Sequence, residues 1–208
     1  MPPTVSSNPP GDAETVSVRA AKEALRDRIR TARAVAEPPA TGAERTARAL
    51  RVCAGHPVIA LYASAPGEPD TWSLVRQLDA AGHRLLLPLL GRRPDGTVRR
   101  EPDWAEFAGV DRMRRGFAGI LEPTGPGLGA EALARASLVW CAGLAATPSG
   151  DRLGTGGGWY DRALAFADPG AVLAVLLRDA EVLDAVPVEP FDRRIGLIVT
   201  EQRTLAVH

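Results

Sequence analysis

The chain has 208 residues, and its 25 basic and 25 acidic side chains give a formal net charge of zero. This length suits one domain with a sizeable core. The charge balance argues against wholesale binding of nucleic acid or of an anionic membrane, and no apolar run is long enough to span a bilayer. Cys53 and Cys141 lie in apolar runs far apart in the sequence. They are typical of reduced core residues in a cytoplasmic protein, not of a disulfide or a zinc site.

The N-terminal segment, residues 1–16, predicts a disordered tail. It is rich in Pro and Ser, and it lacks the basic start and apolar core of a signal peptide. We therefore expect a single folded domain at residues 17–208.

A stripe of basic residues marks the first predicted helix, at about 17–36. Lys22, Arg26, Arg30 and Arg33 recur at helical spacing and share one narrow face. Lys22 is also the only lysine among 25 basic residues, and an ammonium group is a compact charge that suits a single phosphate oxygen. Such a stripe either leans over a binding cleft or forms a solvated charged surface. The sequence leaves both interpretations open.

The rest of the chain predicts short apolar strands that alternate with helices. Helices are expected at about 42–54, 70–81, 130–136 and 159–166 and from 179, strands at 58–62, 84–89, 138–141, 171–177 and 195–200, and a hairpin around 95–96. This alternation predicts an α/β domain with a mostly parallel sheet and helices on both faces. Ligands bind such sheets beyond the carboxyl ends of the strands. Glu68 and a glycine-rich segment at 154–158 both fall there.

The glycine-rich segment gives the strongest functional signal. Backbone N–H groups can turn toward an anion where no Cβ blocks the approach, and a following helix N-terminus favours phosphate. Trp159 and Tyr160 add flat surfaces for a ring, and Asp161 can hold a cation such as Mg²⁺. Together they suggest a nucleotide that acts on an aromatic or heterocyclic substrate. The alternative is a glycine-rich surface turn before a helix with two core aromatic residues.

Five motifs occur in order between about Ala20 and Glu201. They are Lys22-Glu23-Ala24-Leu25-Arg26, Tyr62 to Glu68 with Asp70 and Thr71, Gly119-Ile120-Leu121-Glu122-Pro123, the segment from Gly150 to Asp161, and the segment from Val186 to Asp192. These motifs resemble K-x-x-L-R, Y…E-x-D-T, G-I-x-E-P, G-x-R-L-G-x-G-x-G-Y-Y-D and V-P-x-x-x-x-D of the 5-formyltetrahydrofolate cyclo-ligase family, also called methenyltetrahydrofolate synthetase.

The resemblance implies a fold of the NagB/RpiA/CoA-transferase-like type and an ATP-dependent ligase of one-carbon metabolism. The reaction would convert 5-formyltetrahydrofolate to 5,10-methenyltetrahydrofolate with release of ADP and phosphate. ATP and Mg²⁺ would be the cofactors. The enzyme would be a cytoplasmic monomer without nucleic-acid or membrane partners.

The resemblance also implies a role for each site residue. The ATP site would consist of Lys22, Arg26, Arg152, Gly154, Gly156, Gly157, Gly158 and Tyr160, of which Arg152 and Tyr160 would be catalytic. The folate site would consist of Glu68, Thr155, Gly156 and Trp159. Asp161 and Asp192 would hold Mg²⁺.

Three positions depart from the family pattern. Thr147 stands where the family often has Asp, Trp159 replaces the first tyrosine of a pair, and Phe191 replaces a histidine. The loss of a carboxylate at Thr147 leaves two other interpretations open. One is a non-catalytic relative that binds folate or nucleotide, and the other is an ATP-dependent enzyme of the same fold that acts on another formamide or amide.

Overall fold

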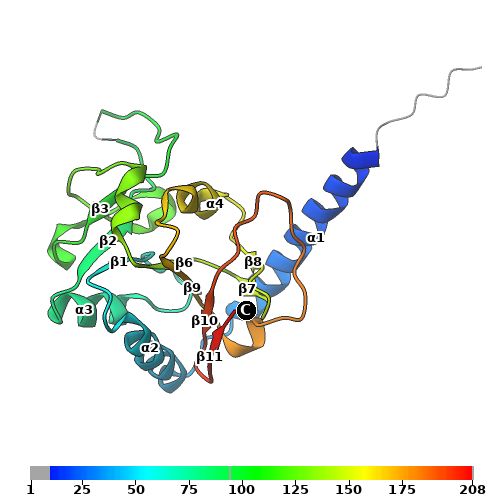
Figure 1. Ribbon diagram of the computed structural model, residues 1–208, viewed down its shortest axis with the longest axis horizontal. Helices are drawn as coiled ribbons and strands as arrows, with labels where there is room; N and C mark the ends of the chain where they lie inside the picture. Colours follow the sequence, from blue (N-terminus) through cyan, green and yellow to red (C-terminus); the bar gives the residue numbers. More distant parts are fainter. Residues whose placement is uncertain (1–9, 94, 208) are drawn as a thin grey trace, which may run out of the picture.

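The computed structural model describes residues 10–93 and 95–207, and in this part of the chain a seven-stranded sheet forms the centre (Figure 1). The strand order is β11-β10-β9-β6-β1-β2-β3. The inner strands are parallel: β1 (Val58–Ala60), β2 (Arg84–Pro88), β6 (Leu138–Cys141), β9 (Val172–Leu176) and β10 (Leu197–Val199). The two edge strands are antiparallel to their neighbours: β3 (Trp104–Glu106) and β11 (Thr204–Ala206). The predicted mostly parallel α/β domain is confirmed.

Helices cover both faces of this sheet because successive strand residues point to opposite sides. Ile59 and Leu61 pack in one core, while Ala60 and Tyr62 pack in the other. The first core includes residues of α2 (Pro39–Cys53) and α3 (Trp72–Ala80). The second includes residues of η3 (Ala130–Arg135), α4 (Trp159–Ala163) and η4 (Leu164–Phe166).

Two small antiparallel hairpins extend the domain beyond the sheet. The first pairs β4 (Met113–Arg115) with β5 (Leu121–Pro123), with η1 (Val110–Arg112) and η2 (Phe117–Gly119) beside it. The second pairs β7 (Ala145–Ala146) with β8 (Arg152–Leu153), and η5 (Asp179–Glu181) follows β9. The β7–β8 hairpin matters most for the site, because the glycine-rich loop follows it directly.

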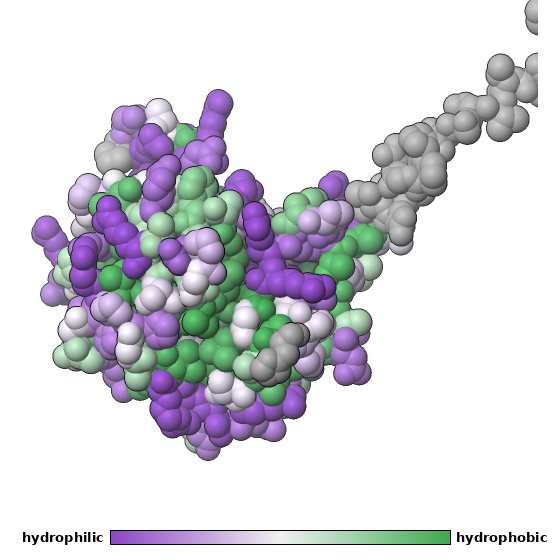
Figure 2. Space-filling model, in the orientation of Figure 1, coloured by the Kyte–Doolittle hydropathy of each residue, from purple (hydrophilic) through white to green (hydrophobic). Residues whose placement is uncertain are grey.

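The N-terminal helix α1 (Pro10–Arg33) extends away from the sheet (Figure 1). Its inner end packs through Ile29 on the β7–β8 hairpin, in a third core that also contains Leu144, Leu153 and Val186. Figure 2 shows hydrophilic side chains where α1 leaves the body of the domain. Among the described residues, no helix combines the length and apolar character that crossing a membrane requires.

Several elements differ from the sequence-based expectations. Residues 10–16 of the predicted tail are helical, because α1 begins at Pro10 and proline suits the first helical position. The rest of that tail, residues 1–9, lies outside the described residues. The predicted hairpin at 95–96 is a tight turn without flanking strands in the described chain, in which Gly96 donates to the Arg93 carbonyl at 2.9 Å.

Candidate active site

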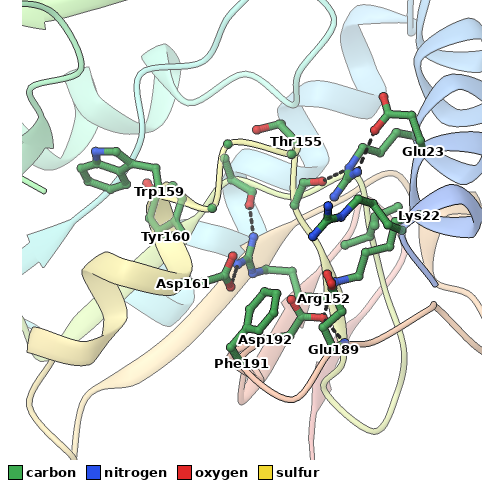
Figure 3. Close-up of a pocket in the computed structure, with 18 residues that line it drawn as sticks. Lys22, Glu23, Arg152, Thr155, Trp159, Tyr160, Asp161, Glu189, Phe191 and Asp192 are labelled. Carbon is green, nitrogen blue, oxygen red and sulfur yellow. Dashed lines mark hydrogen bonds and ion pairs between the residues drawn. The ribbon is translucent and has the colours of Figure 1, made fainter. Parts of the chain in front are cut away.

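A cavity of about 390 Å³ lies between α1, the glycine-rich loop and the segment before β10 (Figure 3). We call it the first cavity. Four separate parts of the chain line it: residues of α1 that include Lys22 and Arg26, Ala142 after β6, residues 152–161 from β8 through the loop into α4, and Glu189, Phe191 and Asp192. All the predicted ATP-site and metal-site residues fall in this lining.

The glycine-rich loop is tied to α1 through its backbone. Arg26 Nε donates to the Gly154 carbonyl at 3.0 Å, and Arg30 Nη2 donates to the Thr155 carbonyl at 2.9 Å. Gly156 has a φ of +111°, which side-chain-bearing residues rarely adopt. A Cβ at Gly154 would lie 2.9 Å from Arg152 Nη1. The backbone therefore favours glycine at 156, and glycine at 154 leaves room for the Arg152 guanidinium.

Lys22 is a buried cation in the wall of the first cavity. It is only 4% exposed, and its Nζ donates to Glu189 Oε2 at 2.7 Å and to Asp192 Oδ2 at 2.6 Å. The Phe191 ring lies beside it, with its centroid 5.7 Å from Nζ. An ammonium group has three donors. One N–H therefore remains beyond the two that these carboxylates engage.

Arg152 is a second buried cation, 5% exposed. Its Nη1 donates to the Ala142 carbonyl at 2.9 Å, and its Nη2 donates to Asp161 Oδ1 at 2.8 Å. The guanidinium lies over the Tyr160 ring, 5.9 Å from the centroid. Nε is buried and meets no hydrogen-bond partner among the residues that the structure describes. These contacts hold the guanidinium in one orientation and leave the Nε–H without a partner in the described chain.

The two predicted metal ligands lie in the same cavity but bind different cations. Asp161 accepts from Arg152 and from the Arg193 backbone N–H at 3.5 Å, whereas Asp192 accepts from Lys22. Glu189 adds a third carboxylate, whose Oε1 is buried without a hydrogen-bond partner in the described chain. Within residues 10–93 and 95–207, no three His, Cys, Asp or Glu side chains form a ready metal cluster.

Tyr160 and Trp159 form an aromatic wall. The Tyr160 hydroxyl donates to the Trp140 carbonyl at 3.3 Å, and burial raises the pKa of this phenol well above its usual value. The phenol therefore stays protonated near neutral pH. Trp159 packs edge-on against Tyr160 and against Trp104, with ring centroids 5.0 Å apart in each pair.

Glu68 lies in a second cavity, of about 700 Å³, on the other side of the glycine-rich loop. Arg30, Arg33 and Arg178 line it together with Glu68, and Thr155 lines both cavities. Glu68 Oε2 accepts from the Ala65 backbone N–H at 2.8 Å, and burial raises the pKa of its carboxyl group. The predicted folate residues are therefore divided: Glu68 lines the second cavity, and Gly156 and Trp159 line the first.

The basic stripe of α1 runs along both cavities. Lys22 and Arg26 line the first, and Arg30 and Arg33 line the second. The interpretation of the stripe as leaning over a cleft is confirmed. Arg33 and Glu189 were not among the predicted site residues. The helical spacing of the basic stripe could have identified Arg33. Glu189 could have been identified only from its place in the last motif.

Thr147 lies outside the lining of both cavities. Its hydroxyl accepts from the Asp151 backbone N–H at 3.1 Å and shares a hydrogen bond with Ser149 Oγ at 2.7 Å. It fixes the turn between β7 and β8. The family carboxylate that Thr147 replaces would therefore lie in this turn and not in either cavity.

Comparison with known proteins identifies the family. Residues 18–201 match the sequence model of the 5-formyltetrahydrofolate cyclo-ligase family. The chain belongs to this family. The 5-formyltetrahydrofolate cyclo-ligase of Mycolicibacterium smegmatis is 32% identical over 145 residues, which are 70% of this chain and 74% of that protein. The protein of the same name from Escherichia coli is 28% identical over 146 residues, or 70% of this chain and 78% of that protein.

Two solved structures share the fold. The 5,10-methenyltetrahydrofolate synthetase of Aquifex aeolicus has a TM-score of 0.73 at 23% identity, over 90% of this chain and 93% of that chain. The synthetase of Mycoplasma pneumoniae has a TM-score of 0.65 at 16% identity, over 86% and 98% of the two chains. The predicted family, fold and ligase activity are confirmed. The roles of individual residues stay predictions.

Proposed function

We propose that the first cavity binds the phosphates of ATP, that the second binds the folate heterocycle, and that phosphoryl transfer occurs near Thr155. The observation that carries this proposal is that Thr155 lines both cavities. Phosphoryl transfer requires two reactants held side by side, and a shared wall brings the two ligands together. Trp159 and Gly156 would border the folate from the first cavity.

The proposed reaction closes a ring in 5-formyltetrahydrofolate. The formyl oxygen attacks the γ-phosphorus of ATP and ADP leaves, which gives an imino-phosphate. N10 of the same substrate attacks the formyl carbon and loses its proton, and phosphate leaves to give 5,10-methenyltetrahydrofolate. The protein mainly positions the two substrates and stabilises phosphoryl charge.

The phosphate contacts follow from the donors left unused in the first cavity. Lys22 would donate its third N–H to a phosphate oxygen, and Arg152 would donate from Nε. Arg26 adds positive charge beside the loop, whose backbone N–H groups would complete the cradle. The Tyr160 ring would pack against the Arg152 guanidinium. Tyr160 would not act as a base, because burial keeps its phenol protonated.

The carboxylates of the first cavity suit Mg²⁺. Asp161 and Asp192 would hold the ion, and the buried Oε1 of Glu189 is a further hard oxygen without a partner in the described chain. Mg²⁺ takes one or two carboxylates together with phosphate oxygens and water. The bound ion would neutralise charge on the transferring phosphoryl group.

We further propose that the enzyme works as a cytoplasmic monomer without nucleic-acid or membrane partners. Both cysteines, Cys53 and Cys141, are buried free thiols, which suits a reducing compartment. The balanced charge suits a small-molecule enzyme.

The non-catalytic alternative is less well supported. It depended on Thr147, which lies in a turn outside both cavities, whereas the cationic side chains of the first cavity are all present. The second candidate, an enzyme that acts on another amide, has no observation in its favour, and the family match opposes it.

The absorbance of 5,10-methenyltetrahydrofolate tests the proposal. We expect product from 5-formyltetrahydrofolate only with ATP, and we expect EDTA to abolish turnover and excess Mg²⁺ to restore it. Turnover without ATP would contradict the mechanism. ATP hydrolysis driven by a different formamide, but not by 5-formyltetrahydrofolate, would favour the second candidate.

A further inference from the structure

Glu189 contributes a buried carboxylate to the first cavity from the segment before β10. Its side chain is 10% exposed, and its Oε2 accepts a hydrogen bond from Lys22 Nζ at 2.7 Å. Asp192, in the same segment, accepts from the same Nζ at 2.6 Å. The Lys22 ammonium group is therefore held between two carboxylates that lie three positions apart in the sequence (Figure 3).

A turn fixes where these two carboxylates lie. Asp192 Oδ2 accepts from the Glu189 backbone N–H at 2.7 Å, and the Asp192 N–H donates to the Glu189 carbonyl at 3.0 Å. Lys22 reaches them from α1, where its charge stands at the end of a flexible four-carbon side chain. The two acceptors on the turn therefore decide where this charge sits in the wall of the first cavity.

Mg²⁺ would give the two carboxylates different roles. The proposed function assigns Asp192 to the ion, which is the largest charge in such a site. A carboxylate whose charge is balanced by Mg²⁺ is a poorer acceptor for an ammonium group. Glu189 then remains as the carboxylate that holds Lys22, and it does so through the Oε2 contact that already exists.

We infer that Glu189 is the positioning residue that keeps Lys22 in the phosphate site while Asp192 binds Mg²⁺. The inference rests on the proposed function, in which the first cavity takes both the phosphates and the ion. Glu189 occupies one N–H of the ammonium group and leaves another for a phosphate oxygen. Without this acceptor the long side chain regains rotamer freedom, and ordering it again weakens nucleotide binding.

Two variants that remove the same charge isolate this hydrogen bond. Glu189→Gln keeps a neutral acceptor, whereas Glu189→Met has a similar length and no strong acceptor. The readout is equilibrium binding of a non-hydrolysable ATP analogue, with and without Mg²⁺. With Mg²⁺ we expect Glu189→Met to bind about tenfold more weakly than Glu189→Gln, because a hydrogen bond to a charged group is lost. Without Mg²⁺ the two variants should agree within about twofold, because Asp192 still holds Lys22.

Glu181 supplies the matched control. Its carboxylate is also buried and binds a cation of α1, Arg33, at 2.7 Å, but it lies outside the lining of the first cavity. Glu181→Met should unfold at a lower temperature than Glu181→Gln, while both bind the analogue with Mg²⁺ equally well. A carboxylate that only anchors α1 to the domain behaves in this way. The control therefore separates placement of Lys22 from general support of the helix.

A measurement on the parent protein covers the case in which Glu189→Met does not fold. Lys22 is the only lysine in the chain, so its isotope-labelled ammonium nitrogen gives an unambiguous side-chain NMR signal. Hydrogen-bond couplings from this nitrogen to labelled carboxylate carbons identify its partners. We expect couplings to both Glu189 and Asp192 in the free protein. When the analogue and Mg²⁺ bind, the coupling to Glu189 should persist and the coupling to Asp192 should decrease.

Equal binding of the analogue with Mg²⁺ by folded Glu189→Met and Glu189→Gln would overturn the inference. A difference of the same size without Mg²⁺ would also overturn it, because Glu189 would then act independently of the metal. Loss of the Glu189 coupling in the parent complex has the same meaning. In these cases a parent that binds the analogue more tightly with Mg²⁺ still supports the proposed function. A parent that does not bind the analogue, or gains nothing from Mg²⁺, overturns the proposed function together with the inference.

Discussion

The two cavities differ in how they balance charge. In the first, each buried cation is held by carboxylates: Lys22 by Glu189 and Asp192, and Arg152 by Asp161. In the second, Arg33 is likewise held by a carboxylate, that of Glu181, but the Glu68 side chain is held by a backbone N–H, and its carboxyl pKa is raised by burial. Fixed cations with spare donors suit a polyanion, whereas a carboxylate with spare lone pairs suits the N–H edge of a ring. One loop therefore separates the cavity that we propose for phosphate from the cavity that we propose for the heterocycle.

The largest expected effect comes from Arg152→Ala. The variant removes a charge-assisted donor from the first cavity, so kcat/KM should fall by about 30- to 150-fold, or about 2–3 kcal/mol. Steady-state kinetics with 5-formyltetrahydrofolate and MgATP measure this loss, and circular dichroism checks the fold. Arg84→Ala is the control, because Arg84 is exposed on β2 and pairs there with Glu106. Near-parent kcat/KM in folded Arg152→Ala would remove Arg152 from the phosphate site.

Lys22→Arg should have the next largest effect. A planar guanidinium group cannot keep both carboxylates of Lys22 and also place a donor on the same phosphate oxygen. The KM for ATP should rise about tenfold, which corresponds to about 1.4 kcal/mol, while the KM for folate stays near the parent value. The control is Arg28→Lys, the reverse exchange at an exposed position of the same helix. Equal ATP KM values in Lys22→Arg and the parent would make Lys22 a purely structural cation.

Glu68→Gln probes the second cavity through pH. The ionised carboxylate accepts the ring N–H, so protonation should weaken folate binding. Because burial raises the Glu68 pKa above its usual 4.5, kcat/KM for folate should fall on the acid side, with a midpoint above 4.5. Glu68→Gln should lose this acid limb and have a folate kcat/KM about tenfold lower at its maximum. An acid limb that persists in Glu68→Gln would belong to another group.

Thr147→Asp should have the smallest effect. The new carboxylate would take over the hydrogen bond from the Asp151 N–H in the β7–β8 turn, as Asp commonly does in turns. Kinetic constants should stay within about twofold of the parent. A large gain in kcat would show that the family Asp acts in catalysis and that the turn interpretation is wrong.

The periodic patterns of the sequence predicted most of the fold. The parallel strands and the helices that cover them were found, whereas β3 and β11 were missed. Both edge strands lie outside continuous apolar runs, whereas the equally short β1 and β10 lie within the apolar runs at 58–62 and 195–200. The helical start at Pro10 was also missed, because composition alone suggested a tail.

The candidate site was predictable where its residues are local in sequence. The glycine-rich loop and the stripe of α1 are local patterns, and both line cavities in the structure. The partners of the buried cations were not predictable. Lys22 and Glu189 are separated by 167 positions, and Arg33 and Glu181 by 148. Only the packing of α1 on the domain brings these charges together.

Crossed binding measurements test the two-cavity account most directly. Dissociation constants for a non-hydrolysable ATP analogue with Mg²⁺ and for 5-formyltetrahydrofolate are measured separately on the parent, Arg152→Ala and Glu68→Gln. The account predicts that Arg152→Ala weakens the nucleotide at least tenfold with little change in folate affinity, and that Glu68→Gln does the reverse. Equal weakening of both ligands by either variant, or the opposite pairing, would contradict the division into a phosphate site and a heterocycle site.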